Sequence, residues 1–162
     1  MVEDAEHLRR AIHAFIRRFG LLEQARTPCG AALPLSHAHA LIELRRTPEL
    51  TQRELAARLM LSKSNVSRLV DRLVAGGRIR RKRDGSDGRA FRLALTGKGR
   101  RLAEHLDGRS LARHRVLLAN VSPSQRAVVI QGLGLLAEAC GGRDGKQGPI
   151  ERSAAPALRS SG

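Results

Sequence analysis

The hydrophobic period of this chain changes near Gly77, and this change most constrains its fold. Before it, two short helices are predicted, because Thr51 and Ser62 can serve as N-caps and each is followed by apolar residues at helical spacing. The four residues from Thr51 to Glu54 also have the pattern of a capping box. After Gly77, residues 91–95 alternate between apolar and other side chains, which predicts two strands around a Gly-rich turn. We therefore expect two capped helices followed by a small hairpin.

Further helices are predicted on both sides of this region. Residues 3–25 should form an amphipathic helix, because their apolar residues recur at alternating steps of four and three. This seam consists of Leu8, Ile12, Phe15, Phe19 and Leu22. A second helix is predicted from an N-cap at Ser36 to about Arg46, and a later one from Thr96 to about Ala119. The last is predicted from Pro123 to about Ala139, and its apolar residues include Leu133 and Leu136.

The chain is strongly basic, with 30 Lys and Arg against 15 Asp and Glu and a net charge of +15. Residues 78–101 hold ten basic and two acidic residues, which is more than half of the excess. A polyanion is the expected partner of such a patch, because Lys and Arg neutralise phosphates and release their counterions. A uniformly solvated basic surface is the alternative, but it would not concentrate the charge in this way.

The second capped helix and the hairpin together suit double-stranded DNA. Side chains at the start of such a helix can enter the major groove, and a hairpin can reach neighbouring phosphates or the minor groove. We predict that the DNA contacts include Arg83 of the hairpin and six residues of the helix, namely Lys63, Ser64, Asn65, Ser67, Arg68 and Arg72. A solvated helix face is the alternative for the helical residues alone, and the adjacent basic hairpin favours DNA binding over it.

The expected fold is mainly α with a small β-hairpin wing, that is, a winged helix-turn-helix with N- and C-terminal dimerisation helices. Residues 1–33 are predicted to be an N-terminal dimerisation helix and loop, and residues 34–96 the winged helix-turn-helix DNA-binding domain. Residues 97–140 should form the C-terminal dimerisation helices. Residues 141–162 are rich in Gly, Pro, Ser and Arg without a hydrophobic period, which predicts a disordered tail.

The run TQRELAARLMLSKSNVSRLVDRLVAGGRIRRKRDGSDGRAFRLALTGKGRRL resembles the winged helix-turn-helix of MarR-family transcriptional regulators. The most specific matches are Leu59, Ser62, Val66, Leu69, Val70-Asp71-Arg72-Leu73, Gly77, Asp84, Asp87, Arg89 and Leu95-Thr96. The resemblance implies that Asp87 braces the wing and that Arg89 points towards the minor groove. It also implies a homodimer that binds a pseudo-palindromic operator as a ligand- or stress-responsive repressor. A monomer that buries its flanking helices internally is the alternative.

Composition disfavours several other classes of protein. Aromatic residues make up only 2% of the chain, which disfavours a base-stacking RNA or single-strand binder. We find no nucleophile–base–acid set, phosphate loop or strong metal motif, so the protein is predicted not to be an enzyme. No apolar run approaches the roughly 18 residues of a membrane span, and no signal core begins the sequence, so we expect a cytoplasmic protein without a membrane partner. Non-specific DNA packing and a winged-helix module that binds another protein remain as alternatives.

Four residues are candidates for sensing, namely Cys29, His37, His39 and His105. Their distribution is similar to the ligands of the zinc-sensing branch of the MarR family, but Arg109 stands where that branch has a second histidine. We therefore expect surface or capping histidines rather than a zinc site, no cofactor, and an inert Cys29 rather than a thiol switch. An apolar pocket between the dimer arms and the DNA-binding lobe should suit an aromatic or phenolic acid, although no residue in the sequence selects that effector.

Overall fold

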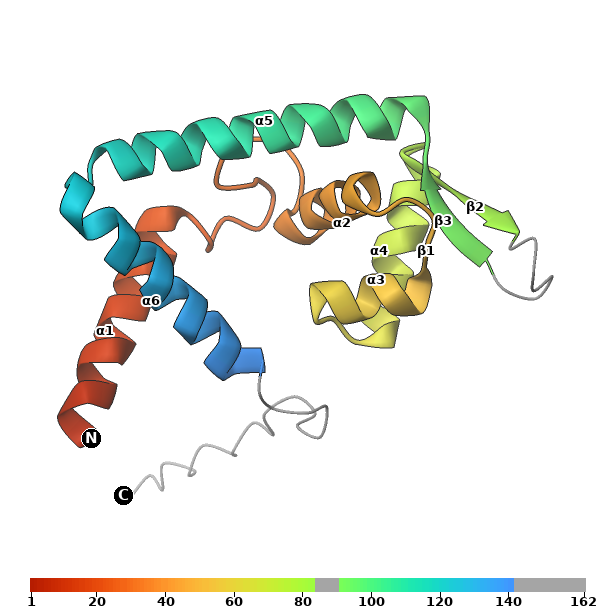
Figure 1. The fold of residues 1–162 in the computed structure, drawn as a ribbon. Coiled ribbons are helices and arrows are strands. Elements are labelled where there is room, and N and C mark those ends of the chain that lie inside the picture. The colour runs from red at the N-terminus through yellow and green to blue at the C-terminus, as the bar shows by residue number, and fades with distance from the viewer. Residues whose placement is uncertain (84–90, 142–162) are drawn as a thin grey trace, which may run out of the picture. The chain divides into compact units, whose positions relative to one another are not determined.

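The computed structural model describes residues 1–83 and 91–141 (Figure 1). The chain divides into two compact units, residues 1–116 and 117–162, which are described separately. The elements of the first unit are α1 (Val2–Phe19), α2 (Leu35–Arg46), β1 (Leu50–Thr51), α3 (Gln52–Leu59), α4 (Lys63–Ala75), β2 (Ile79–Arg83) and β3 (Phe91–Leu95). α5 (Gly97–Ala119) begins in the first unit and ends in the second, and α6 (Pro123–Gly141) belongs to the second. The predicted disordered tail lies outside the described residues, except for Gly141 at the end of α6.

The strands form one antiparallel sheet in the order β1–β3–β2. β2 and β3 pair from Ile79 opposite Leu95 to Arg83 opposite Phe91, which is the predicted hairpin. β1 adds Leu50 opposite Leu93. The sequence did not predict β1, because two residues are too few to show an alternating pattern. The mainly helical fold class with a small wing is confirmed.

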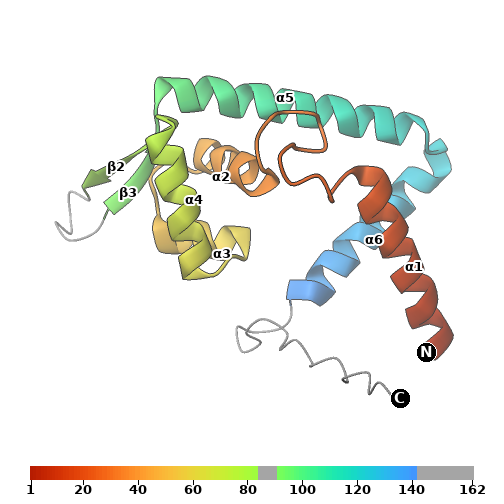
Figure 2. The ribbon, with the colours of Figure 1, turned by 180° about the vertical axis from the view of Figure 1, so that it is seen from behind.

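The hydrophobic core joins α2, α3, α4, the sheet and the first half of α5. In Figures 1 and 2, α2 lies between α5 and the α3–α4 pair. The largest fully buried side chains are Leu41, Leu44, Leu55, Val66, Val70, Leu73, Ile79, Leu93 and Leu106. Each contributes about 1.5–3 kcal/mol when it is fully buried, so this aliphatic cluster fixes the position of α4 against α2 and α3.

The two predicted N-caps of the helix-turn-helix are confirmed. The Glu54 N–H donates to Thr51 Oγ1 at 3.2 Å, and the Thr51 N–H donates to Glu54 Oε2 at 2.7 Å, which completes the capping box of α3. The Thr51 N–H and the Thr51 hydroxyl both donate to Glu54 Oε2, and these two bonds lower the pKa of the Glu54 carboxyl because they favour its charged form. At α4, the Asn65 N–H donates to Ser62 Oγ at 3.3 Å.

Two predicted helix ends are wrong. α1 ends at Phe19 instead of near residue 25, because Gly20 adopts a left-handed conformation with φ 82° and closes the helix. Leu22 therefore lies beyond the helix. α2 begins at Leu35 after Pro34, and no side chain caps it. Ser36 is thus inside the first turn of α2 and is not its N-cap.

The start of α5 is joined to the segment between α4 and β2. Thr96 Oγ1 donates to the Gly77 carbonyl at 2.7 Å and accepts from the Gly99 N–H at 3.0 Å. Gly99 is buried, and a Cβ built on it would lie 1.8 Å from the Arg78 carbonyl oxygen. Only glycine allows this approach, so the first turn of α5 rests directly on the backbone that enters the wing.

Candidate nucleic-acid interface

The turn between α3 and α4 is closed by backbone hydrogen bonds. Met60 adopts a left-handed conformation with φ 52°, and the N–H groups of Met60 and Leu61 donate to the carbonyls of Ala57 and Ala56. Ser62 then caps α4 within two residues. This tight turn presents the beginning of α4, the expected recognition helix, at the surface of the unit.

One side of α4 is buried and the other carries polar and basic side chains. Val66, Leu69, Val70 and Leu73 face the core. Of the residues predicted to contact DNA, five are exposed on this helix: Lys63, Ser64, Asn65, Arg68 and Arg72. Ser67 is only half-exposed. Arg68 Nη2 donates to Asn65 Oδ1 at 3.0 Å, so the two side chains form one hydrogen-bonding pair on the exposed face.

The wing strand β2 extends the basic surface. Its residues from Arg80 to Arg83 are all exposed, and Arg83 lies at the end of the strand nearest the wing tip. Asp87 and Arg89, the other two predicted wing contacts, lie outside the described residues. The described basic residues of β2 lie beside those of α4. An ion pair between Arg81 of β2 and Asp71 of α4 connects the two elements.

Two ion pairs that the sequence analysis missed hold the wing in place. Arg81 Nη2 on β2 lies 2.6 Å from Asp71 Oδ1 on α4, and Lys82 Nζ lies 2.7 Å from Glu49 Oε1 before β1. Both are partly exposed, so each contributes at most about 1 kcal/mol to stability. Their effect is to orient β2 relative to the helix. No local pattern could reveal them, because the partners are far apart in sequence.

His37 lies beside α4, at the N-terminal end of α2. Its side chain is only 8% exposed, and Nδ1 has no hydrogen-bond partner among the described residues. Burial lowers the pKa of His37, and the nearby charges of Arg72 and Arg78 lower it further. Both effects favour the neutral form of the imidazole.

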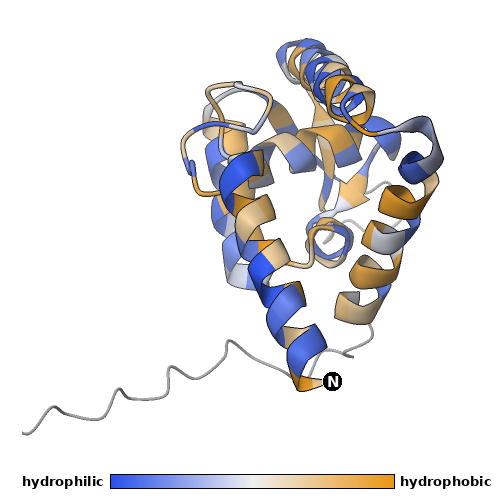
Figure 3. Cartoon of the chain, turned by 90° about the vertical axis from the view of Figure 1, so that its left-hand side faces the viewer, coloured by the Kyte–Doolittle hydropathy of each residue, from blue (hydrophilic) through white to orange (hydrophobic). Residues whose placement is uncertain are grey.

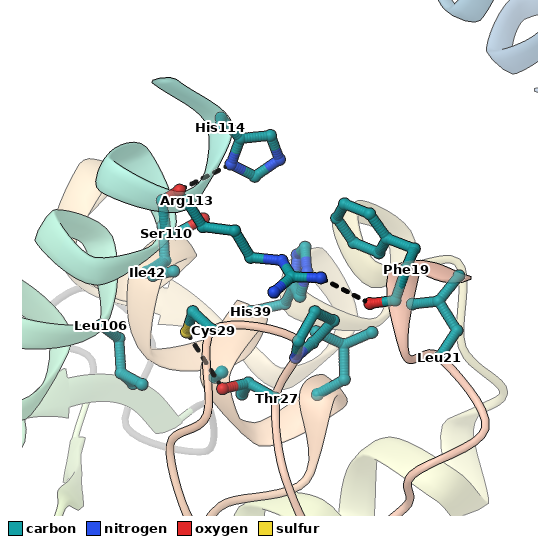
Figure 4. Close-up of a pocket in the computed structure, with 13 residues that line it drawn as sticks. Phe19, Leu21, Thr27, Cys29, His39, Ile42, Leu106, Ser110, Arg113 and His114 are labelled. Carbon is teal, nitrogen blue, oxygen red and sulfur yellow. Dashed lines mark hydrogen bonds between the residues drawn. The ribbon is translucent and has the colours of Figure 1, made fainter. Parts of the chain in front are cut away.

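A second feature of the first unit is an apolar pocket of about 240 Å³ between the end of α1, the following loop, α2 and α5 (Figure 4). Its walls include Phe19, Leu21, Ile42 and Leu106. Arg113 supplies a positive charge at its edge, where Nη2 donates to the Phe19 carbonyl at 3.1 Å and the guanidinium lies 5.1 Å from the Phe19 ring centre. The Nε atom of Arg113 is buried without a partner among the described residues.

The four predicted sensing residues are not brought together. Cys29 and His39 line the apolar pocket, and Cys29 Sγ lies 3.0 Å from Thr27 Oγ1. His37 lines a different cleft beside α4, and His105 is exposed on α5. Within residues 1–83 and 91–141, no group of three or more His, Cys, Asp or Glu side chains is placed to hold a metal ion. Arg113 and His114, which the sequence analysis did not select, also line this pocket, together with the polar residues Thr27 and Ser110.

This architecture is similar to that of known proteins. Residues 33–90 match the model of the MarR family. A search of curated protein sequences found no match.

FabT of Streptococcus pneumoniae in complex with DNA is 20% identical, with a TM-score of 0.72 over 85% of this chain and 97% of that one. PcaV of Streptomyces coelicolor with its natural ligand is 26% identical, with a TM-score of 0.58 over 84% of this chain and 90% of that one. BpsR of Bordetella bronchiseptica, described with regulation of its DNA binding by 6-hydroxynicotinic acid, is 19% identical, with a TM-score of 0.64 over 83% and 98%.

The described helices include none that is long and apolar enough to cross a membrane. The family match begins just before α2 and extends into the wing, so it covers α3, the turn and α4 completely. Because MarR proteins are DNA-binding regulators, the prediction that this protein is not an enzyme is confirmed. Residues 33–90, the winged helix-turn-helix of this chain, are therefore of the MarR-family type.

Proposed function

We propose that this MarR-family regulator binds a pseudo-palindromic operator as a homodimer, represses transcription there, and is released by a small aromatic acid. The observation that carries the proposal is the exposed polar and basic face of α4, continued by the exposed basic residues of β2. Such a surface combines hydrogen-bonding groups for base edges with charge for phosphates. The DNA complex of FabT, which has the same fold, supports this use of the surface.

The homodimer is proposed from two helices whose apolar residues are exposed. α1 has no buried residue, and Leu8, Ile12 and Phe15 are 43%, 40% and 45% exposed on one side of it. α6 also has no buried residue, although it is largely hydrophobic, as Figure 3 shows. Its exposed apolar residues are Val128, Val129, Ile130, Leu133, Leu135 and Leu136. Exposed apolar surface of this extent is typical of protein–protein interfaces, and a second copy of the chain is the occupant that the family favours.

The apolar pocket is proposed as the effector site. Its walls suit a flat aromatic ring, and Arg113 can bind a carboxylate in place of the Phe19 carbonyl. The ligand-bound structures of relatives support this kind of control, since the DNA binding of BpsR is regulated by 6-hydroxynicotinic acid. We propose no metal or other cofactor for this pocket.

Selection of bound fragments from genomic DNA with the purified protein tests the proposed function. We expect recovery of a short inverted repeat that binds at least 10³-fold more tightly than a scrambled duplex at the same salt concentration. In that complex, Arg68→Ala should cost about 1–3 kcal/mol and relax the preference at one operator position, because Arg68 lies on the exposed face of α4. Equal affinity for operator and scrambled duplexes would instead indicate non-specific DNA packing.

A variant of Arg113 tests the effector site. We expect hydroxybenzoates or hydroxynicotinates to weaken operator binding of the wild-type protein, and Arg113→Gln to reduce effector affinity at least tenfold, because a charged hydrogen bond is lost. His105→Ala is the matched control, since His105 is exposed on the same helix and does not line the pocket. Isothermal titration of the acids, without DNA, measures both. An equal loss in the two variants would show that the acid binds elsewhere.

A further inference from the structure

A second cleft lies on the side of α4 that faces the beginning of α2. It has a volume of about 350 Å³ and is lined from α2 by Ser36 and His37 and from α4 by Asn65, Arg68 and Arg72, over a floor that includes Leu69. Among its described lining residues there is no Asp or Glu. The cleft is therefore positively charged, and its charge is not neutralised by its own walls.

Two arginines of α4 give the cleft its positive charge. Arg68 and Arg72 are four residues apart on α4, so they occupy neighbouring positions on the same side of the helix. Arg68 donates to Asn65, and neither guanidinium pairs with a carboxylate among the described residues. Two neighbouring cations without a carboxylate partner make the cleft attractive to an anion.

The beginning of α2 adds donors to the same cleft. No side chain caps this helix, so its first amide groups have no side-chain acceptor. Ser36, in the first turn, has its hydroxyl available because it does not serve as the cap. An uncapped helix N-terminus favours an anion through these donors and through the helix dipole.

His37, in the same wall, is a buried polar group whose ring has an unpartnered nitrogen among the described residues. Its side chain is more than nine-tenths buried in the wall of the cleft, and its Nδ1 has no partner among the described residues. The charged groups that face it are Arg72 of α4 and Arg78, which follows α4. No carboxylate is among the charged groups that act on this buried imidazole, so the positive charge of the wall is not compensated within the cleft.

We propose that this cleft is an oxyanion site that holds one backbone phosphodiester of the bound DNA, with Arg72 as its main ligand and Ser36 and the first amides of α2 as further donors. This inference rests on the proposed function. It adds that different residues of α4 contact the DNA backbone and the bases. Arg72 positions the protein on the DNA backbone, whereas residues nearer the middle of the exposed face, such as Ser64, are left to contact bases.

A methylphosphonate scan of the selected operator tests this site. Each duplex carries one uncharged linkage, and its affinity for the full-length protein is measured at several salt concentrations. We expect one linkage in each half-site at which neutralisation weakens wild-type binding roughly tenfold. Arg72→Gln should bind operator and scrambled duplexes roughly tenfold more weakly, with a salt slope lower by about one, and should lose nothing further at that linkage.

Arg17→Gln is the matched control, because it removes the same charge from an exposed position on α1. This variant should retain the full loss at the same linkage. If Arg72→Gln loses as much there as the wild type does, Arg72 does not hold that phosphate and the inference is wrong, while the proposed function stands. Failure of the wild-type protein to select any operator would instead overturn the proposed function.

Titration of inorganic phosphate into the protein without DNA tests whether the cleft binds a phosphodiester of DNA or a free phosphate ion. The imidazole NMR signals of His37 report on the cleft, because His37 forms part of its wall. We expect only weak shifts at millimolar phosphate, since a free anion lacks the other contacts of the duplex. A saturable shift at micromolar phosphate, abolished by Arg72→Gln and accompanied by no sensitive linkage in the scan, would assign the cleft to a free anion and overturn the DNA assignment.

Discussion

Gly99→Ala is expected to lower the free energy of unfolding by about 3 kcal/mol or more, because overpacking against backbone is among the costliest single changes. The added methyl group would lie 1.8 Å from the Arg78 carbonyl oxygen, and that oxygen belongs to backbone that cannot rotate away. α5 must then move off the entrance to β2. The movement also strains the hydrogen bond between Thr96 Oγ1 and Gly77. Urea unfolding followed by circular dichroism measures the loss, and operator titration measures the displacement of the wing.

Gly108→Ala provides the control on the same helix. Gly108 lies within α5, and a Cβ there meets nothing within 4 Å. Alanine should therefore stabilise the helix by about 0.5–1 kcal/mol, because it reduces the conformational freedom of the unfolded chain. Equal effects of the two substitutions would mean that α5 does not rest on Arg78.

Phe15→Asp is expected to convert the proposed homodimer into a monomer. Phe15 stacks on Phe19 with ring centres 4.9 Å apart, yet it is 45% exposed, so in a dimer it would be covered by the second copy. An aspartate there would be buried without a partner, which costs about 3–5 kcal/mol and raises the dimer dissociation constant at least a hundredfold. Sedimentation equilibrium measures this change, and the loss of operator affinity should accompany it.

His13→Asp is the control for added charge on α1. His13 is exposed, and it is one residue from Ile12 and two from Phe15, spacings at which side chains do not face each other on a helix. This variant should remain a dimer. A monomeric wild type, or a Phe15→Asp protein of unchanged mass, would show that the apolar side of α1 has another role.

The parts of the fold that the sequence predicted well depend on neighbours in the chain. Thr51 and Glu54 satisfy each other within one turn, and Ser62 caps α4 through Asn65, so their patterns could be recognised without the rest of the protein. The hairpin was equally accessible because β2 and β3 are consecutive. Local chemistry therefore fixed α3, α4 and most of the wing.

The errors arise where local signals compete or where distant segments meet. Ser36 is a good N-cap by type, but Pro34 already fixes the backbone geometry that starts α2. Gly20 ended α1 before Leu22 could join its apolar side. The pair between Asp71 and Arg81 and the cleft around Ser36 and Arg72 depend on how α2 and β2 pack against α4. No spacing in the sequence specifies that packing.

The contact of Gly99 with Arg78 allows α5 to connect the apolar pocket with the wing. Gly99 lies at the wing, and Arg113 lies in the apolar pocket on the same helix. Arg113 comes fourteen positions after Gly99, which corresponds to about 21 Å along a helix that rises 1.5 Å per residue. An unbroken helix is stiff over this length, so we expect a shift of the helix at Arg113 to change the contact of Gly99 with Arg78 without any element unfolding. A proline substituted near Gly108 should kink α5. We expect such a variant to bind the effector and the operator separately, but to lose the release of DNA by the effector.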